Sequence, residues 1–344
     1  MSPRPSDPRS FNTVRHSRRE ERARRYRQGR VVLLAILAVF ALLILAGLVF
    51  LILLGAHSCQ KKKVTSESDT TSGNSTAIQY AVLTQNSAQI HTGELIVVNK
   101  DHAYQGNTES ADQAGFTAIL STQTIYADDG NNTIYRRVAG VALRTEVLDA
   151  LDRMMTEYHL LASDDRVQLY DAFRSYAEQA ALTSSTAAAP GYSDHHTGYL
   201  IALRDVNSTN SSLSGEQDDW LRENGYKFGF VQRYPAGHSG STFVNNYTNA
   251  YRYVGVPHAT AMVQKGMCLE EYVAYLKNNH KYEQEHLQVK QKETISGKTV
   301  ETVYEIYYVP ASGGEMTDIP VPSNFGYTIS GDNLSGFIVT VKLG

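Results

Sequence analysis

The sequence contains a run of 25 residues, Val31–Gly55, without one charged side chain. Leucine, valine, isoleucine and alanine make up most of it. Because an α-helix rises about 1.5 Å per residue, a helix of this length is roughly 37 Å long and crosses a bilayer core of about 30 Å with some tilt. We therefore expect residues 31–55 to form a transmembrane helix, with any globular domain confined to one side of it.

The arginines before this run predict its orientation. Ten arginines precede it, whereas Lys61, Lys62 and Lys63 are the basic residues that follow it closely. Cytoplasmic flanks of membrane spans are enriched in Lys and Arg. We expect residues 1–30 to form a cytoplasmic tail that also meets anionic lipid, and the region after the span to be extracytoplasmic at the plasma membrane. A cleaved signal peptide is the alternative, but this run is longer than a signal-peptide core and no small-x-small cleavage site follows it.

The charge of the rest of the chain argues against a nucleic-acid partner. Of the 32 Lys+Arg and 35 Asp+Glu residues, 13 and 3 respectively lie in residues 1–63, which leaves 19 basic and 32 acidic residues from position 64 onward. An acidic surface repels phosphate groups and offers no basic stripe for them. Nucleic-acid binding therefore has little support in this part of the chain.

The residue pattern after the span predicts a stalk, a mixed α+β domain and a β-rich end. Residues 56–78 are rich in Ser and Thr and are expected to form a flexible stalk. Within the domain at 79–284, Glu94–Asn99 is predicted to be a strand and Thr145–Leu161 an amphipathic helix. Residues 285–344 are rich in Val, Ile, Tyr and Thr, which predicts strands. Further expected strands are Val167–Asp171, Tyr199–Val206, Phe228–Arg233, Val300–Val309 and Gly336–Leu343, and further helices are Ser175–Leu182, Ser214 to Gly225 and Leu269–Leu276.

Several short motifs follow one another in the expected domain. Their order and spacing resemble those of the VanY-type D-alanyl-D-alanine carboxypeptidases. The resemblance implies an α+β fold, with a small antiparallel sheet and flanking helices, and removal of the terminal D-Ala from peptidoglycan stem peptides in the bacterial cell wall. The motifs are Asp171-Ala-Phe-Arg-Ser-Tyr-Ala-Glu-Gln179, Pro190-Gly-Tyr-Ser-Asp-His-His-Thr-Gly198, Gly225-Tyr-Lys-Phe-Gly-Phe230, Arg233-Tyr-Pro235, Tyr251-Arg-Tyr-Val-Gly255 and Cys268-Leu-Glu-Glu-Tyr272.

The resemblance also implies a zinc site, from which this sequence departs. In the family, two His and one Asp hold the zinc and a carboxylate serves as general base. Ser193 and His195 match the Ser-x-His-x6-Asp motif, but Ala202 stands where the Asp is expected. Counting back from Tyr-Arg-Tyr-Val-Gly places Ala250 at the second His and Tyr247 at the base. His195 is the remaining ligand match, so we expect no bound zinc and no catalytic residue.

Other residues are not expected to replace the missing ligands. Asp205 is the nearest carboxylate to the missing Asp, but side chains alternate along a strand, so it faces the other side. His238 and His258 fall at expected loop and helix-start positions, where a solvated histidine is the usual interpretation. Cys59 and Cys268 belong to no Cys/His pattern with metal-ligand spacing, so we expect two unpaired thiols.

The substrate-binding part of the family pattern is retained. Arg174 matches the arginine that contacts the peptide, and a guanidinium can form paired hydrogen bonds with a carbonyl or a carboxylate. Ser193, Tyr176 and Gln179 also stand at matching positions, where they can line a groove or serve as turn and core residues. Arg252 is expected to form a structural ion pair.

Three functions follow from this pattern. The first is a pseudopeptidase that binds peptidoglycan stem peptide or a wall-synthesis partner without cutting. The second is an active zinc D,D-carboxypeptidase with relocated ligands. The third is a structural protein-interaction module in which Tyr247 and its neighbours fill the groove.

Overall fold

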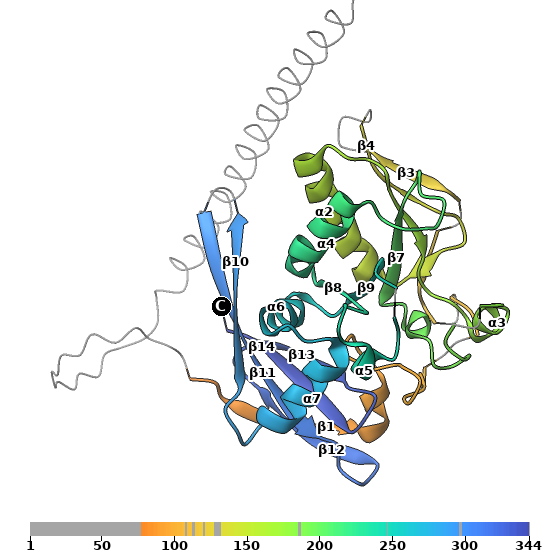
Figure 1. The fold of residues 1–344 in the computed structure, drawn as a ribbon. Helices are drawn as coiled ribbons and strands as arrows, with labels where there is room; N and C mark the ends of the chain where they lie inside the picture. The colour runs from red at the N-terminus through yellow and green to blue at the C-terminus, as the bar shows by residue number, and fades with distance from the viewer. Residues whose placement is uncertain are drawn as a thin grey trace, which may run out of the picture. The chain divides into compact units, whose positions relative to one another are not determined.

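The computed structural model describes most of the chain after residue 76. The expected tail, transmembrane helix and most of the stalk lie outside the described residues. Among the described residues no helix is both long enough and apolar enough to cross a membrane. Residues 77–294 and 299–343 belong to one compact unit (Figure 1). The described ranges are 77–106, 109–111, 114–119, 121–126, 132–184, 187–245, 247–295 and 298–343.

A six-stranded sheet carries the family-like motifs. Its strands, in spatial order, are β3 (Gln123–Tyr126), β4 (Thr133–Arg137), β6 (Val167–Asp171), β7 (Leu200–Asp205), β9 (Ala250–Tyr253) and β8 (Phe230–Gln232). Neighbours are antiparallel, except that β4 and β6 are parallel. This parallel pair departs from the expected antiparallel sheet. It arises because helix α2 (Thr145–Ala162) lies between the two strands in sequence, and parallel neighbours need such a crossover.

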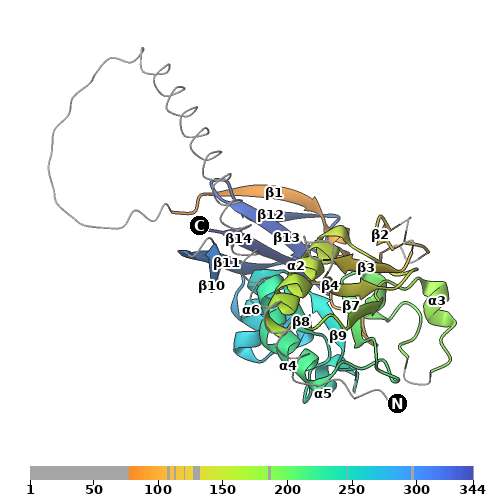
Figure 2. The same cartoon turned by 90° about the horizontal axis from the view of Figure 1, so that it is seen from above.

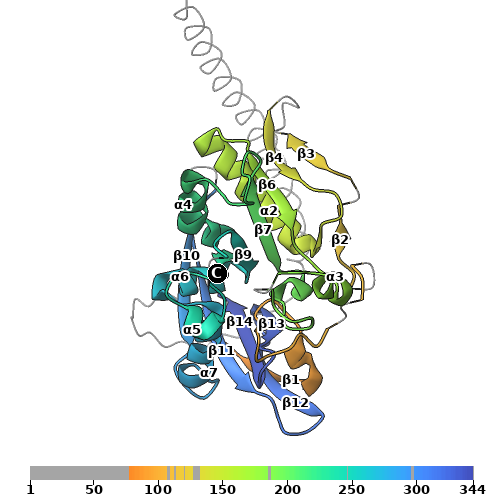
Figure 3. The ribbon, with the colours of Figure 1, turned by 45° about the vertical axis from the view of Figure 1, so that its right-hand side comes forward.

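Helix α2 packs against this sheet through one apolar face, as its residue spacing predicts (Figure 3). It ends at Ser163, which adopts a left-handed conformation with φ 54°. Its buried side chains share a hydrophobic cluster with Leu169, Leu203 and Phe230 from three strands. The cluster therefore fixes the sheet from one side. The buried residues of α2 are Val147, Ala150, Leu151, Met154, Met155 and Tyr158.

Of the remaining helices, α4, α6 and α7 have ten or eleven residues, and α3 and α5 have five and four. The predicted capping box of Ser214 with Gln217 is present at the start of α4. Two other helices begin with the same arrangement, in which the N-cap side chain accepts a backbone N–H from the third helical residue and that residue's side chain bonds back. These are α3, with Ser175 and Glu178, and α7, with Cys268 and Glu271. The helices are α3 (Tyr176–Ala180), α4 (Gly215–Asn224), α5 (Ser239–Thr242), α6 (Val256–Lys265) and α7 (Leu269–Asn279), with single turns η1 (Ser87–His91), η2 (Asp194–Thr197) and η3 (Gly225–Phe228).

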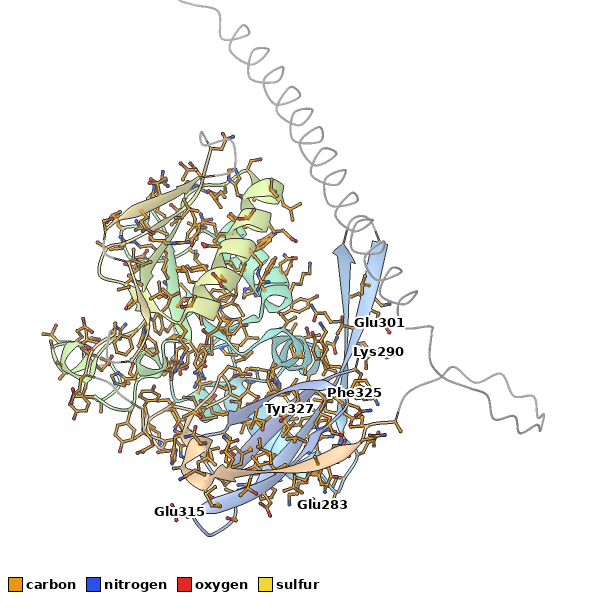
Figure 4. The ribbon with its side chains drawn as sticks, turned by 180° about the vertical axis from the view of Figure 1, so that it is seen from behind. Glu283, Lys290, Glu301, Glu315, Phe325 and Tyr327 are labelled. Carbon is orange, nitrogen blue, oxygen red and sulfur yellow. The ribbon has the colours of Figure 1, made fainter. Side chains whose placement is uncertain are left out.

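The C-terminal strands form a second sheet whose core includes α6 and α7. Met262 and Tyr272 from these helices share a hydrophobic cluster with Val289, Ile306 and Ile338 from the strands. Figure 4 shows Lys290 and Glu301 on the neighbouring strands β10 and β11, where their charged atoms lie 3.6 Å apart. The boundary predicted at residue 285 falls between α7 and β10. The strand order is β10 (Leu287–Ile295), β11 (Lys298–Pro310), β14 (Gly336–Lys342) and β13 (Gly326–Gly331).

Two further strand pairs complete the described fold. Strand β1 (Tyr80–Asn86) runs antiparallel to β12 (Met316–Pro322) over seven residues (Figure 2). None of the side chains of β1 is buried. The shorter pair joins β2 (Thr117–Ala118) to β5 (Ala142–Leu143). The start of the described region is therefore attached to the C-terminal part of the chain through backbone hydrogen bonds.

The predicted strand Glu94–Asn99 is wrong. Residues 95–98 are at most 1% exposed, but they form an irregular segment. Arg252 donates to the carbonyls of Glu94 and Ile96, and Arg233 donates to that of Val98. A continuous apolar run indicates burial without indicating which partner satisfies the backbone. Here two buried guanidinium groups donate hydrogen bonds to backbone carbonyls that would otherwise accept them from a neighbouring strand.

Candidate functional site

His195 lies in the single turn η2, with its ring buried against Tyr247. Its Nδ1 contacts the carbonyl of Ala172, which can only accept, so Nδ1 carries the proton. The lone pair on Nε2 then accepts the hydroxyl proton of Tyr247, at 2.9 Å. The two rings are stacked, with centroids 6.1 Å apart. The nitrogen that a metal would need is therefore occupied by a phenol.

Ala202 and Ala250 are direct cross-strand partners on β7 and β9. Both are fully buried. The four positions that the resemblance assigns to ligands and base thus occur as two contacting pairs, 202 with 250 and 195 with 247, from the same two chain segments. Two methyl groups and one capped imidazole do not fit zinc, which needs three protein ligands in such a site.

The Arg174 guanidinium already has partners within the chain. Its Nε lies 3.0 Å from Asp171 Oδ2, and its Nη1 lies 2.9 Å from Gln179 Oε1. Burial alone would lower the pKa of Arg174, but the hydrogen bonds and charge of Asp171 raise it above its usual value. Asp171 Oδ1 is also 3.8 Å from His195 Nδ1. Any peptide carboxylate at Arg174 must compete with Asp171.

The other predicted groove residues have different surroundings. Gln179 is 3% exposed and donates to the carbonyl of Ala188, so it joins Arg174 to that loop. Ser193 is buried, and its carbonyl accepts the N–H of His196. Tyr176 is 52% exposed on α3. The structure therefore brings Arg174 and Gln179 together beside His195 and leaves Tyr176 on the surface.

A buried charge network fixes the turn that carries His195. Asp194 accepts from Arg233 at 2.5 Å and also pairs with Arg252, and all three side chains are fully buried. Arg233 in turn pairs with Glu270 at 2.7 Å. Burial lowers the pKa of Arg252, although Asp194 opposes that effect. The expected structural ion pair of Arg252 is present, with the residue before His195 as its partner.

Two of the carboxylate and histidine candidates have structural roles. Asp205 pairs with Arg166 at 3.1 Å and accepts from Gln217, as expected for a side chain that faces away from the site. His258 is not solvated, contrary to prediction. It is 1% exposed and hydrogen-bonds to the Tyr272 hydroxyl and to Thr340. Helix-start position alone does not reveal that a C-terminal strand covers this histidine.

Sequence spacing does not predict the one group of candidate metal ligands in the described part of the chain. His238, Cys268 and Glu271 each offer an atom within 4.8 Å of the others. Cys268 belongs to no Cys/His pattern with metal-ligand spacing in the sequence, and it is a free thiol in the structure, as predicted. Its position before Leu-Glu-Glu-Tyr, where Ser or Thr is the usual N-cap, is the one signal that sequence offers. Cys59 lies outside the described residues.

Comparison with known proteins supports the expected fold. Residues 140–256 match the VanY family, described as D-alanyl-D-alanine carboxypeptidase. A D-alanyl-D-alanine carboxypeptidase of Enterococcus faecium is 28% identical over 275 residues, covering 78% of this chain and 81% of the relative. Another, from Enterococcus faecalis (strain ATCC 700802 / V583), is 38% identical over 120 residues, which is 34% of this chain and 44% of the relative. The crystal structure of the vancomycin resistance D,D-dipeptidase VanXYg, in complex with a D-Ala-D-Ala phosphinate analogue, matches with a TM-score of 0.58 and 24% identity over 77% of this chain and 99% of that one.

Proposed function

Because the chain carries a VanY-family D-alanyl-D-alanine carboxypeptidase domain, we propose that it is a cell-wall pseudopeptidase, which binds without cutting. One observation carries this proposal. The Tyr247 hydroxyl caps Nε2 of His195, while Ala202 faces Ala250 where two further ligands would stand. A zinc peptidase needs three ligands, an open position for water and a base.

Tyr247 does not replace the missing base. Burial raises the pKa of its phenol far above the usual value, and the nearby Tyr170 and Asp171 raise it further. Burial also lowers the pKa of His195. Both groups are therefore neutral near pH 7, and the Tyr247 hydroxyl donates its proton in a hydrogen bond to His195. This pair offers neither a metal-bound water nor a carboxylate to activate one.

The described residues give little support to relocated zinc ligands. The group His238, Cys268 and Glu271 lies at the starts of α5 and α7. The partners that these three side chains have in the structure are one another, Ser241 and the backbone around Cys268. They are separate from the hydrogen bonds of His195, Tyr247 and Arg174. A metal held there would share no hydrogen-bonded partner with Arg174, which we propose as the peptide-binding residue.

The purified full-length chain is expected to release no D-Ala from a pentapeptide ending in D-Ala-D-Ala. The reason is the absence of ligands and base around His195. Chromatographic measurement of free D-Ala, with the E. faecium carboxypeptidase as positive control, tests this. Release that stops both with a chelator and in His195→Ala would establish the active enzyme instead.

Binding of the stem peptide is the role that we propose for the retained Arg174. Asp171 competes for the guanidinium, and a flexible peptide pays ordering costs, so we expect a Kd of about 0.1–1 mM. Arg174→Ala should weaken binding about ten-fold or more, since a charge-assisted hydrogen bond contributes about 1.5–3 kcal/mol. NMR titration of the labelled full-length chain measures both values.

Asp171→Asn is the matched control for this experiment. It removes the charge that competes for Arg174 and keeps the side-chain shape, so it should tighten binding while Arg174→Ala weakens it. Both substitutions break the same ion pair. If breaking it merely disrupted the fold, both variants would bind the peptide more weakly. Absence of peptide shifts at several millimolar in both the unsubstituted chain and Asp171→Asn would leave a protein partner, with Tyr247 filling the groove, as the better assignment.

We also propose that residues 31–55 anchor the protein with its C-terminal domain outside the cell. The support is the uncharged run and the arginines that precede it. Protease added to intact cells should remove a C-terminal tag. A tag that survives until the cells are lysed would contradict this topology.

A further inference from the structure

The N-cap side chain of α7 has a sulfur atom where the N-cap side chains of α3 and α4 have a hydroxyl oxygen. All three helices have a capping box, but the N-cap residue is Ser175 in α3, Ser214 in α4 and Cys268 in α7. Ser is among the preferred N-cap residues, and Cys is not. The capping geometry therefore does not explain the thiol, because the same chain builds the same cap twice with a hydroxyl.

A histidine from a separate segment meets this cap. His238 Nδ1 lies 2.8 Å from Glu271 Oε2 and 3.0 Å from Oε1, and the Ser241 hydroxyl donates to Oε1 at 2.9 Å. The Glu271 carboxylate also accepts the backbone N–H of Cys268, at 3.2 Å. One sulfur, one imidazole nitrogen and one carboxylate oxygen thus lie within 4.8 Å of one another.

We propose that Cys268, His238 and Glu271 bind a divalent transition-metal ion, with Zn²⁺ as the best match. Thiolate, imidazole and carboxylate are the ligand types that zinc uses in proteins. The thiolate and the carboxylate together carry two negative charges, which neutralise a divalent ion. Ser241 orients the carboxylate through its hydrogen bond, as supporting groups around metal ligands do.

The arrangement without metal has protons where the ion would be. His238 Nδ1 points at both carboxylate oxygens, so its proton occupies the space between nitrogen and oxygen. Burial raises the pKa of the Cys268 thiol to about 12, and Glu270 and Glu271 contribute to this rise. Burial would also raise the pKa of Glu271, but hydrogen bonds from His238 and Ser241 hold it below its usual value. Metal binding must release the proton of the Cys268 thiol, whereas the imidazole of His238 can bind through Nδ1 once its proton lies on Nε2, so the affinity increases with pH through the thiol.

A metal here would add a further connection between two segments that already meet through the hydrogen bonds of His238 and Ser241 to Glu271. His238 immediately precedes the four-residue helix α5, and Cys268 and Glu271 begin α7. The chain after α5 continues to Tyr247, the residue that covers His195. The ion would therefore hold in place the segment that closes the family site, without belonging to that site.

Cobalt titration of the metal-free full-length chain tests the site. We expect about one equivalent of Co²⁺ to bind with the ligand-to-metal charge-transfer band of a cobalt thiolate, and binding to strengthen between pH 6 and pH 8. Cys268→Ser keeps the capping box and should abolish the band and weaken binding at least ten-fold. His238→Ala should weaken binding to a similar extent, whereas His195→Ala should leave it unchanged.

Other outcomes have distinct meanings. The same unfolding temperature for metal-free Cys268→Ser and the unsubstituted chain would show that the serine preserves the cap. If the folded chain gives no thiolate band, or if Cys268→Ser binds cobalt as tightly as before, the inference is overturned. Metal binding that is lost in His195→Ala and kept in Cys268→Ser would overturn it too, and would count against the proposed loss of the family zinc site.

Discussion

Ala202→Asp combined with Ala250→His and Tyr247→Glu is expected to create a zinc site at His195. Positions 202 and 250 are already cross-strand partners, so the new side chains start from adjacent points on β7 and β9. Tyr247→Glu removes the hydroxyl from His195 Nε2 and restores a carboxylate at the position of the base. Three ligands with an open fourth position are the usual catalytic arrangement.

Elemental analysis and unfolding temperature measure this repair. In a Cys268→Ser background, which eliminates the other candidate site, we expect about one zinc per chain, bound through His195. Without zinc the variant should be less stable, because it buries new polar groups. Zinc at about a thousand times its Kd should then restore roughly 4 kcal/mol. The Ala202→Asp, Ala250→His variant that keeps Tyr247 is the matched control and should bind zinc more weakly. A folded triple variant without zinc would show that the four positions do not converge.

Asp194→Ala is expected to be the most destabilising single substitution in the domain. It leaves Arg233 and Arg252 buried without their shared carboxylate. Removal of one partner from a buried ion pair typically costs about 3–5 kcal/mol, which is a large fraction of the roughly 5–15 kcal/mol that stabilises a folded domain. Urea unfolding of the full-length chain should show a correspondingly lower midpoint.

Asp101→Ala is the surface control for this measurement. The pair of Asp101 with Lys100 is exposed, and exposed pairs contribute about 0–1 kcal/mol. Asp194→Asn keeps the shape of the side chain and removes its charge, so it should also destabilise strongly. If both Asp194 variants unfold at the same urea concentration as Asp101→Ala, the charge network does not hold the turn of His195.

Local residue patterns predict much of the central fold. The apolar spacing of Thr145–Leu161 matches α2, and Val167–Asp171 matches β6 in both bounds. Both elements have a periodicity that only one structure satisfies. Residues 95–98 have no such periodicity. Their continuous apolar run indicates that they are buried but not which secondary structure they form. Their backbone partners, Arg233 and Arg252, come from distant parts of the chain and leave no local sign.

The candidate site is predictable in position but not in its contacts. Motif spacing predicts that positions 195, 202, 247 and 250 belong together, and the two contacting pairs agree with that. It does not predict that the Tyr247 hydroxyl bonds to His195, because this depends on the path of the chain between α5 and β9. Spacing also cannot bring His238 to Cys268, since that contact depends on how α5 packs on α7.

The attachment of β1 to β12 determines where mechanical load enters the folded region. Tension along the chain before Ala77 would first meet the bonds of Ala77 and Gln79 with Ser323 and Asn324, and then the seven residues of β1 that pair with Met316–Pro322. The Tyr80 hydroxyl adds a bond to Glu305, and its ring contacts Tyr307. A pull along the strand would shear these lateral hydrogen bonds together, rather than opening them singly. If the preceding chain is under tension, the C-terminal strands would take up that tension before it reaches His195 and Arg174.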